Sequence, residues 1–206
     1  MRRVLLTAFE PYDRWKENAS WLALMEVTRQ PIAGIKLITR RYPVDFEAVQ
    51  QRLEEDLAQQ PEVALHLGQA PGLGRIHLEA IGLNVGGHSS QMPDTFQPLV
   101  PEGPVAYRSQ LPLADWAASL RAQGIPCQVS YHAGTYLCNA LLYLSLHRAA
   151  QRGLRLQAAF VHLPLAPVQV LDQRQDWPSL PTFVAADAIR WMLSQLADPG
   201  DRPPTA

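Results

Sequence analysis

The stretch of this sequence best suited to chemistry is residues 133–139, which contain Cys138. A strand-like run over residues 126–131 precedes it, and an apolar-periodic segment typical of a helix follows it over residues 141–147. We therefore expect Cys138 near the start of a helix, where unpaired backbone N–H groups and the positive end of the helix dipole favour a thiolate. A thiolate is the competent cysteine nucleophile, so the position suits covalent catalysis. The alternative is that Cys138 is a small buried core residue, as free cysteines often are.

Two further side chains supply the other parts of a thiol-hydrolase triad. His162 interrupts a hydrophobic, strand-like run over residues 158–164, and Glu79 lies in a similar run over residues 76–81. A Cys, a His and a carboxylate at or just beyond strands are the components of such a triad. Taken singly, His162 is better explained as a core histidine and Glu79 as a solvent-facing residue on a half-buried strand.

The composition is that of a globular protein. Of the 206 residues, 47% are apolar and 18% are charged, and this length favours one domain with a substantial core. The formal net charge of −1 gives no electrostatic case for binding nucleic acid or an anionic membrane surface. No stretch approaches the ~20 apolar residues of a transmembrane helix. Residues 1–7 are interpreted as a strand and not as a signal peptide.

The chain has two cysteines, Cys127 and Cys138. A disulfide between them depends on a geometry that the sequence does not define. Because a catalytic thiol must stay free, we expect a reducing, cytoplasmic location. We expect neither a metal nor a cofactor.

Strands and helices alternate along the chain. Hydrophobic runs predict strands over residues 3–7, 36–40, 63–67, 75–85, 126–131 and 156–163. Helical spacing predicts helices that end near residues 27, 57, 122, 152 and 196. Asn18 or Ser20 is the expected N-cap of the first helix, Asp45 caps the second, and Gly153 follows the fourth.

This alternation indicates the α/β class, with helices on both faces of a mostly parallel sheet. Residues 86–104 are rich in Gly, Ser and Pro and lack periodicity, so we expect a long functional or interface loop there. We expect a single domain over residues 1–197 and a disordered tail over residues 198–206.

Four motifs resemble, in their order, those of the type I pyroglutamyl peptidases (pyrrolidone carboxyl peptidases), a family of cysteine peptidases. They are Leu5 to Tyr12 (LLTAFEPY), His66 to Gly72 (HLGQAPG) with Glu79 ten residues after Gln69, the segment around Cys138, and the segment around His162. The resemblance extends to about residue 167, which is most of the chain. It implies a three-layer α/β/α sandwich with a mixed, mostly parallel central sheet, and a homo-oligomer, either a dimer or a tetramer.

The resemblance also implies an activity, which is removal of an N-terminal pyroglutamyl residue from small peptides. Cys138 would attack the scissile carbonyl, His162 would take and return a proton, and Glu79 would orient the imidazole. The pyroglutamyl ring is a flat lactam without an ammonium, so its pocket should be apolar with a few hydrogen-bonding groups. The resemblance places in this pocket Phe9, Tyr12, Asn18, Gln69, Tyr136 and Leu137.

The chain departs from the family around this pocket. The usual Phe-Gly-Gly after the first proline is Tyr12-Asp13-Arg14, so we expect a loop that does not use glycine conformations and a pocket that gains a hydroxyl. The Gly-Gly-Arg after the Gln-Ala pair is Pro71-Gly72-Leu73. An arginine ten residues past the glutamate is replaced by Ser89, and Arg75 and His88 are the candidates to substitute for it.

Two other functions stay open at this point. One is a cysteine amidohydrolase that acts on another small cyclic or blocked amide, since the altered loops change the pocket. The other is a ligand-binding relative of low activity. Retention of Cys138, His162 and Glu79 together weighs against the second, because binding a lactam requires none of them.

Overall fold

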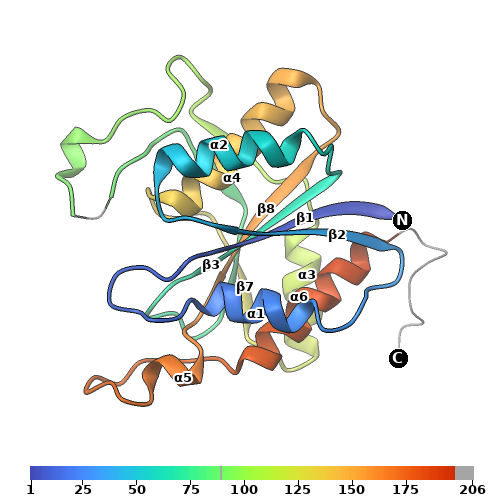
Figure 1. Cartoon of the computed structure of the whole chain (residues 1–206), viewed down its shortest axis with the longest axis vertical. Coiled ribbons are helices and arrows are strands. Elements are labelled where there is room, and N and C mark those ends of the chain that lie inside the picture. The colour runs from blue at the N-terminus through green and yellow to red at the C-terminus, as the bar shows by residue number, and fades with distance from the viewer. Residues whose placement is uncertain (89, 198–206) are drawn as a thin grey trace.

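A six-stranded sheet forms the centre of the molecule in the computed structural model, which describes residues 1–88 and 90–197 (Figure 1). The strand order is β2-β1-β3-β8-β4-β7. The strands are β1 (Arg2–Phe9), β2 (Ile35–Tyr42), β3 (Val63–Gln69), β4 (Ile76–Glu79), β7 (Cys127–Ser130) and β8 (Gln157–Leu163). The expected tail at 198–206 lies outside the described residues.

The sheet is mixed, with one antiparallel pair of neighbours. β2, β1, β3 and β8 run parallel, β4 runs antiparallel to β8, and β7 runs parallel to β4. β3 is buried along its whole length, as expected for a central strand covered on both faces. The predicted α/β class and mixed, mostly parallel sheet are confirmed.

Helices cover both faces of the sheet and complete a three-layer sandwich (Figure 1). Apolar side chains of α1, α3 and α6 pack in the core on one face, and those of α2 and α4 pack in the core on the other. The helices are α1 (Ala19–Val27), α2 (Phe46–Leu57), α3 (Leu113–Ala122), α4 (Leu137–Arg152) and α6 (Thr182–Leu196), with a short α5 (Pro167–Val170).

Several helix ends follow the local signals in the sequence. The side chain of Asn18 accepts a hydrogen bond from the backbone of Ser20 at the start of α1, and that of Asp45 accepts one from Ala48 at the start of α2. At the end of α4, Gly153 adopts the left-handed conformation with φ 62°. The alternative cap Ser20 is instead the second residue of α1.

The single strand expected over residues 75–85 is wrong. The chain makes β4, leaves the main sheet at Ala80, and then makes β5 (Ile81–Leu83). β5 pairs antiparallel with β6 (Ala106–Arg108) in a separate two-stranded sheet. A methyl group on Gly82 would come within 2.7 Å of the Tyr143 backbone, so this glycine allows β5 to lie directly against α4.

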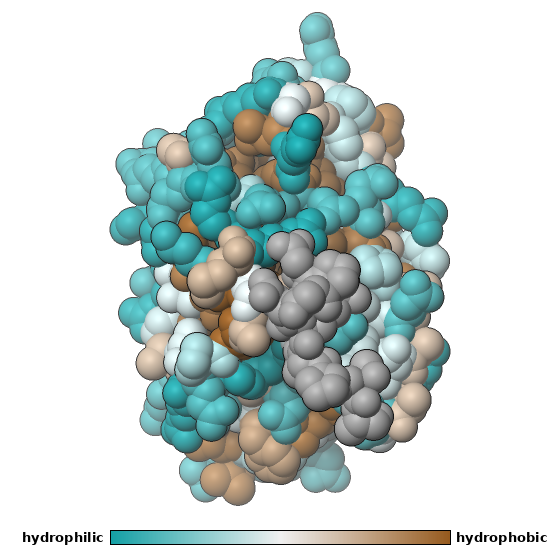
Figure 2. All heavy atoms as spheres, turned by 90° about the vertical axis from the view of Figure 1, so that its right-hand side faces the viewer, coloured by the Kyte–Doolittle hydropathy of each residue, from teal (hydrophilic) through white to brown (hydrophobic). Residues whose placement is uncertain are grey.

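The described residues of the segment over 86–104, which are 86–88 and 90–104, are largely irregular, as expected, with one 3₁₀ turn η1 (Pro93–Thr95). It extends from the α2–α4 side of the molecule (Figure 1). The face shown in Figure 2 is mostly hydrophilic, and hydrophobic side chains appear on it in smaller areas. Across the described part of the chain, no helix is both long and apolar enough to cross a membrane.

Candidate active site

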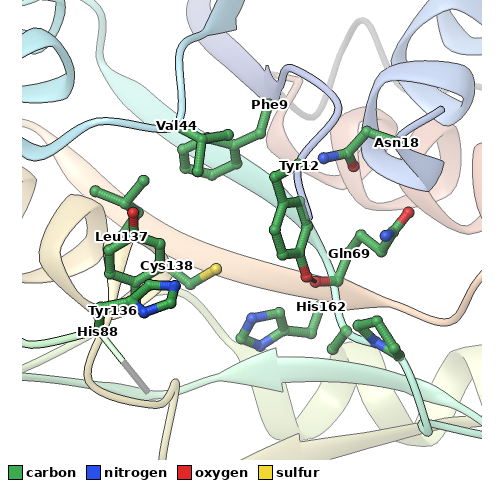
Figure 3. A pocket seen from close by; sticks show the side chains of 12 residues that line it. Phe9, Tyr12, Asn18, Val44, Gln69, His88, Tyr136, Leu137, Cys138 and His162 are labelled. Carbon is green, nitrogen blue, oxygen red and sulfur yellow. Dashed lines mark hydrogen bonds between the residues drawn. The ribbon is translucent and has the colours of Figure 1, made fainter. Parts of the chain in front are cut away.

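A pocket of about 300 Å³ lies where β1, β3 and β8 end and α4 begins (Figure 3). The carboxyl ends of parallel strands are where α/β proteins generally place their ligands. Eight of the nine residues predicted for the site line this pocket, and the ninth, Glu79, lies behind His162. The described lining consists of Phe9, Tyr12, Asn18, Val44, Gln69, Ala70, Pro71, His88, Tyr136, Leu137, Cys138 and His162.

Cys138 is the second residue of α4, and its sulfur points into the pocket (Figure 3). The backbone N–H groups of Leu137 and Cys138 belong to the first helical turn, which has no intrahelical acceptor for them. They make no hydrogen bond to another described residue. They are therefore free donors beside the thiol.

Two residues, Gly68 and Asn139, hold Cys138 in this position. Gly68 on β3 has no side chain, and a methyl group there would come within 2.5 Å of the Phe160 ring and 3.2 Å of the Cys138 sulfur. Asn139 is fully buried, accepts a hydrogen bond from the Leu83 backbone at 2.8 Å and donates to the carbonyls of Leu83 and Val85. The start of α4 is thus fixed against both sheets.

His162 and Glu79 meet across the antiparallel pair β8–β4. His162 lies directly opposite His77, so Glu79, two residues further on, is its diagonal neighbour on the same face of the sheet. The Nδ1 atom of His162 is 2.8 Å from Oε1 of Glu79. Glu79 is 1% exposed and His162 is 8% exposed, so water does not weaken the interaction.

Neighbouring groups shift the pKa values of His162 and Glu79 in opposite directions. Burial alone would lower the pKa of His162, but the adjacent Cys138 and Glu79 outweigh burial and raise this pKa to about 10. Burial would raise the pKa of Glu79, yet its hydrogen bond to His162 keeps that pKa below its usual value. The arrangement therefore favours an imidazolium at His162 that is paired with the Glu79 carboxylate.

Aromatic and aliphatic side chains form the wall of the pocket. Phe9, Tyr12, Tyr136 and Leu137 all line it, as the resemblance implied. The Tyr12 hydroxyl lies 3.4 Å from the backbone oxygen of Gln69, to which it donates. Burial, with a smaller effect of Cys138, raises the pKa of Tyr12 to about 12, so this hydroxyl stays neutral.

Asn18 and Gln69 shape the wall through buried hydrogen bonds. The Asn18 amide nitrogen donates to the Glu10 carbonyl, while its oxygen caps α1. The side-chain oxygen of Gln69 accepts hydrogen bonds from the backbone N–H of Ala19 and from the Gln169 amide. The Gln69 side chain therefore points to the start of α1, whereas its backbone oxygen lies at Tyr12 in the pocket (Figure 3).

The expectation for the loop after β1 is wrong. Asp13 adopts φ 54°, the left-handed conformation that glycine adopts most easily. Aspartate is one of the few other residues that visit this region, because its short polar side chain tolerates it. The loop thus keeps a glycine-like turn without glycine.

The structure also distinguishes the two candidates for the missing arginine. His88 lines the pocket, whereas Arg75 is exposed and donates a hydrogen bond to Gln128. Ser89 itself lies outside the described residues. Val44 and Ala70 line the pocket without having been predicted, because a small apolar residue in a loop carries no chemical signal in the sequence.

Among residues 1–88 and 90–197, no group of three or more His, Cys, Asp or Glu side chains is arranged to hold a metal ion. The groups that the site offers for chemistry are the thiol, the imidazole, the carboxylate and the backbone N–H groups.

Comparison with known proteins identifies the family to which the chain belongs. The model of the pyroglutamyl peptidase family matches residues 2–197. The chain belongs to this family. As a member of the pyroglutamyl peptidases it is a cysteine peptidase, and the resemblance inferred from the four motifs is confirmed.

Individual pyroglutamyl peptidases are similar along nearly the whole chain. The pyrrolidone-carboxylate peptidase of Pectobacterium atrosepticum is 34% identical over 203 residues, which cover 95% of this chain and 93% of that protein. The protein of the same name from Yersinia pestis is 33% identical, with 92% of this chain and 88% of that one covered. The crystal structure of the pyrrolidone carboxyl peptidase of Fervidobacterium islandicum superposes with a TM-score of 0.90, at 33% identity, covering 95% of this chain and 98% of that one.

Proposed function

We propose that this protein is a cysteine exopeptidase that removes the N-terminal pyroglutamyl residue from peptides, with Cys138 as nucleophile, His162 as general acid and base, and Glu79 as the partner that orients His162. The observation that carries this proposal is the 2.8 Å contact between His162 and Glu79, together with the placement of His162 and Cys138 in one pocket. A buried carboxylate bonded to one imidazole nitrogen fixes the ring and stabilises its positive charge.

In the first half of the reaction, the Cys138 thiolate attacks the carbonyl carbon of the scissile amide. The negative charge that develops on the carbonyl oxygen is stabilised by the free N–H groups at the start of α4, including that of Cys138. The His162 imidazolium donates its proton to the leaving nitrogen, so the shortened peptide departs as a neutral amine. The pyroglutamyl group remains as a thioester on Cys138.

In the second half, water hydrolyses the thioester. His162, now neutral, accepts a proton from the water as the oxygen attacks the acyl carbon. Collapse of the tetrahedral intermediate breaks the carbon–sulfur bond and releases pyroglutamate and the thiolate. Glu79 stabilises the imidazolium each time it forms, and it does not itself take up the proton.

Specificity for a pyroglutamyl group follows from the neutrality of the pocket wall. None of the described residues that line the pocket is an aspartate or glutamate, so an N-terminal ammonium would lose its hydration without gaining a partner. A lactam carries no such charge. Its N–H is suited to donate to the Gln69 backbone oxygen, beside the Tyr12 hydroxyl.

We also propose a cellular location, a domain extent and an oligomeric state for the enzyme. Both cysteines are free thiols, which supports the reducing cytoplasm as its location. We further propose one catalytic domain over residues 1–197 and a homo-oligomer, a dimer or a tetramer, on the basis of the family resemblance.

The test of this function is release of a chromogenic amine from its pyroglutamyl amide by the purified protein. Alanyl and leucyl amides of the same amine serve as controls. We expect release from the pyroglutamyl amide alone. Release only from other cyclic or N-blocked amides would instead identify an amidohydrolase of a different specificity.

A further inference from the structure

A second hollow of about 520 Å³ lies next to the pocket, between α2 and the irregular segments 86–88 and 90–99. The pocket and this hollow share two lining residues, Tyr136 and His88. The Tyr136 ring packs edge-on against Phe46 at 5.1 Å and against His88 at 4.6 Å. These aromatic side chains thus form the boundary between the two spaces.

One side of the pocket opens directly on to the hollow, and the opposite side is closed. Phe9, Asn18 and Gln69 are each at most 4% exposed and close its inner side. Tyr136 and His88 are only partly buried and open on to the hollow. A chain that leaves the pocket on this side crosses these two residues and enters the hollow.

The chemistry of the hollow suits a neutral peptide segment. None of its described lining residues is Asp, Glu, Lys or Arg, and side-chain amides of Gln50, Gln91 and Gln97 face it beside the apolar Phe46 and Leu99. Amide side chains both donate and accept hydrogen bonds, as the peptide backbone does. Apolar walls with a few amides are typical of a site for uncharged residues.

His88 is equipped to contact the peptide at the boundary. The backbone N–H of Ser90 donates to Nδ1 of His88, so in the neutral ring the proton lies on Nε2. Nε2 has no hydrogen-bond partner among the described residues. It is therefore a free donor for a carbonyl oxygen of the substrate.

From this geometry we propose that the hollow binds the residues that follow the pyroglutamyl group, on the leaving side of the scissile amide, with His88 donating to a peptide carbonyl as the chain enters. This inference rests on the proposed function, because it assigns the hollow to the same substrate. It predicts that a peptide is a better substrate than an amide too short to reach the hollow.

The experiment compares two substrates on the full chain. One is pyroglutamyl amide, which releases only ammonia, and the other is pyroglutamyl-Ala-Ala-Ala. The variant Gln50→Trp fills the hollow, and the matched control Gln51→Trp alters the adjacent residue of α2, which is exposed and bonded to Glu55. The quantity measured is the ratio of kcat/KM for the peptide to kcat/KM for the amide.

We expect this ratio to be well above one in the parent and to fall roughly tenfold in Gln50→Trp, the scale set by the loss of one buried apolar contact. It should stay unchanged in Gln51→Trp. At the boundary, His88→Leu should lower the ratio, and His88→Gln, which keeps a donor, should retain most of it.

A parent ratio near one, or a ratio that Gln50→Trp leaves unaltered, would overturn the assignment of the hollow while the proposed function stands. If the parent cleaves neither pyroglutamyl substrate, the proposed function fails, and the assignment of the hollow fails with it.

Discussion

At the scale of single residues, the protein keeps two thiols in different environments. Cys138 is half-buried and lines the pocket at the start of α4. Cys127 is 2% exposed on β7, and burial raises its pKa to about 11. At pH 8 only about one Cys127 in a thousand is a thiolate, by the definition of the pKa. Cys127 is therefore a structural residue of the core. Cys138 differs from it in being partly exposed to the pocket.

Alkylation should separate the two cysteines. We expect one equivalent of iodoacetamide at pH 8 to label Cys138 and abolish activity, in both the parent and Cys127→Ala. Cys138→Ser should be inactive and unlabelled, since Cys127 is buried and protonated. Peptide mass spectrometry identifies the labelled residue. An inactive Cys127→Ala protein that is correctly folded would show that the nucleophile is misassigned.

Substitution of His162 should lower the turnover rate more than substitution of Glu79. His162→Ala removes both proton transfers, so we expect almost no turnover. Glu79→Gln keeps a hydrogen-bonding group at 2.8 Å from His162 but loses the charge that stabilises the imidazolium. We expect a measurable rate, lowered on the order of 10⁴-fold, as for the equivalent change in serine peptidases. Steady-state kinetics on a chromogenic pyroglutamyl amide measure both, and a Glu79→Gln rate close to the parent's would remove Glu79 from the triad.

At the scale of elements, the sequence predicted most helices and strands of the main sheet, because caps and hydrophobic periodicity are local signals. It did not predict that the chain changes sheets at Ala80, although the apolar alternation of Ile76, Leu78 and Ala80 shifts by one position there and continues with Ile81 and Leu83. The short β6 and α5 were also missed. Elements of three or four residues form through contacts with distant segments. A local sequence pattern does not predict such contacts.

A buried polar chain links three elements beneath the site. Nδ1 of His66 on β3 is 2.8 Å from the Thr7 hydroxyl on β1, and its Nε2 is 2.9 Å from the Ser145 hydroxyl on α4. His66 is fully buried, and burial lowers its pKa to about 3. The folded protein therefore holds this ring neutral at pH values where the unfolded chain, with a histidine pKa of about 6.5, is protonated.

This difference makes stability depend on pH with a definite sign. Between about pH 6.5 and pH 3 the unfolded state binds one more proton at His66 than the folded state, so acidification favours unfolding. The contribution approaches ~1.4 kcal/mol per pH unit. We expect the free energy of unfolding of the parent, relative to that of His66→Gln, to fall as the pH is lowered from 7 to 4. Urea titrations across this range measure it, and a constant difference would contradict the assignment.

At the scale of the whole molecule, the fold assembles the site from segments far apart in the chain. The loop after β1, the end of β3, β4, the start of α4 and the end of β8 converge on one edge of the sheet (Figure 1). The motifs identified the chemically distinctive members, Cys138, His162 and Glu79. The sequence could not show that β4 runs antiparallel to β8, which is what places Glu79 diagonally across from His162. Nor could it show which of Arg75 and His88 lies in the pocket.

The measurement that tests the central claim most directly is kcat/KM on a matched pair of substrates, the pyroglutamyl and glutaminyl amides of one amine. The glutaminyl group carries an ammonium that the closed lactam lacks, and none of the described residues around the pocket is an acidic partner for it. We expect rapid hydrolysis of the pyroglutamyl amide and a kcat/KM for the glutaminyl amide lower by a factor of at least ~100, typical of leaving a buried charged group unpaired. Comparable values for the two substrates would contradict a pocket built for a neutral lactam and would indicate a broader aminopeptidase.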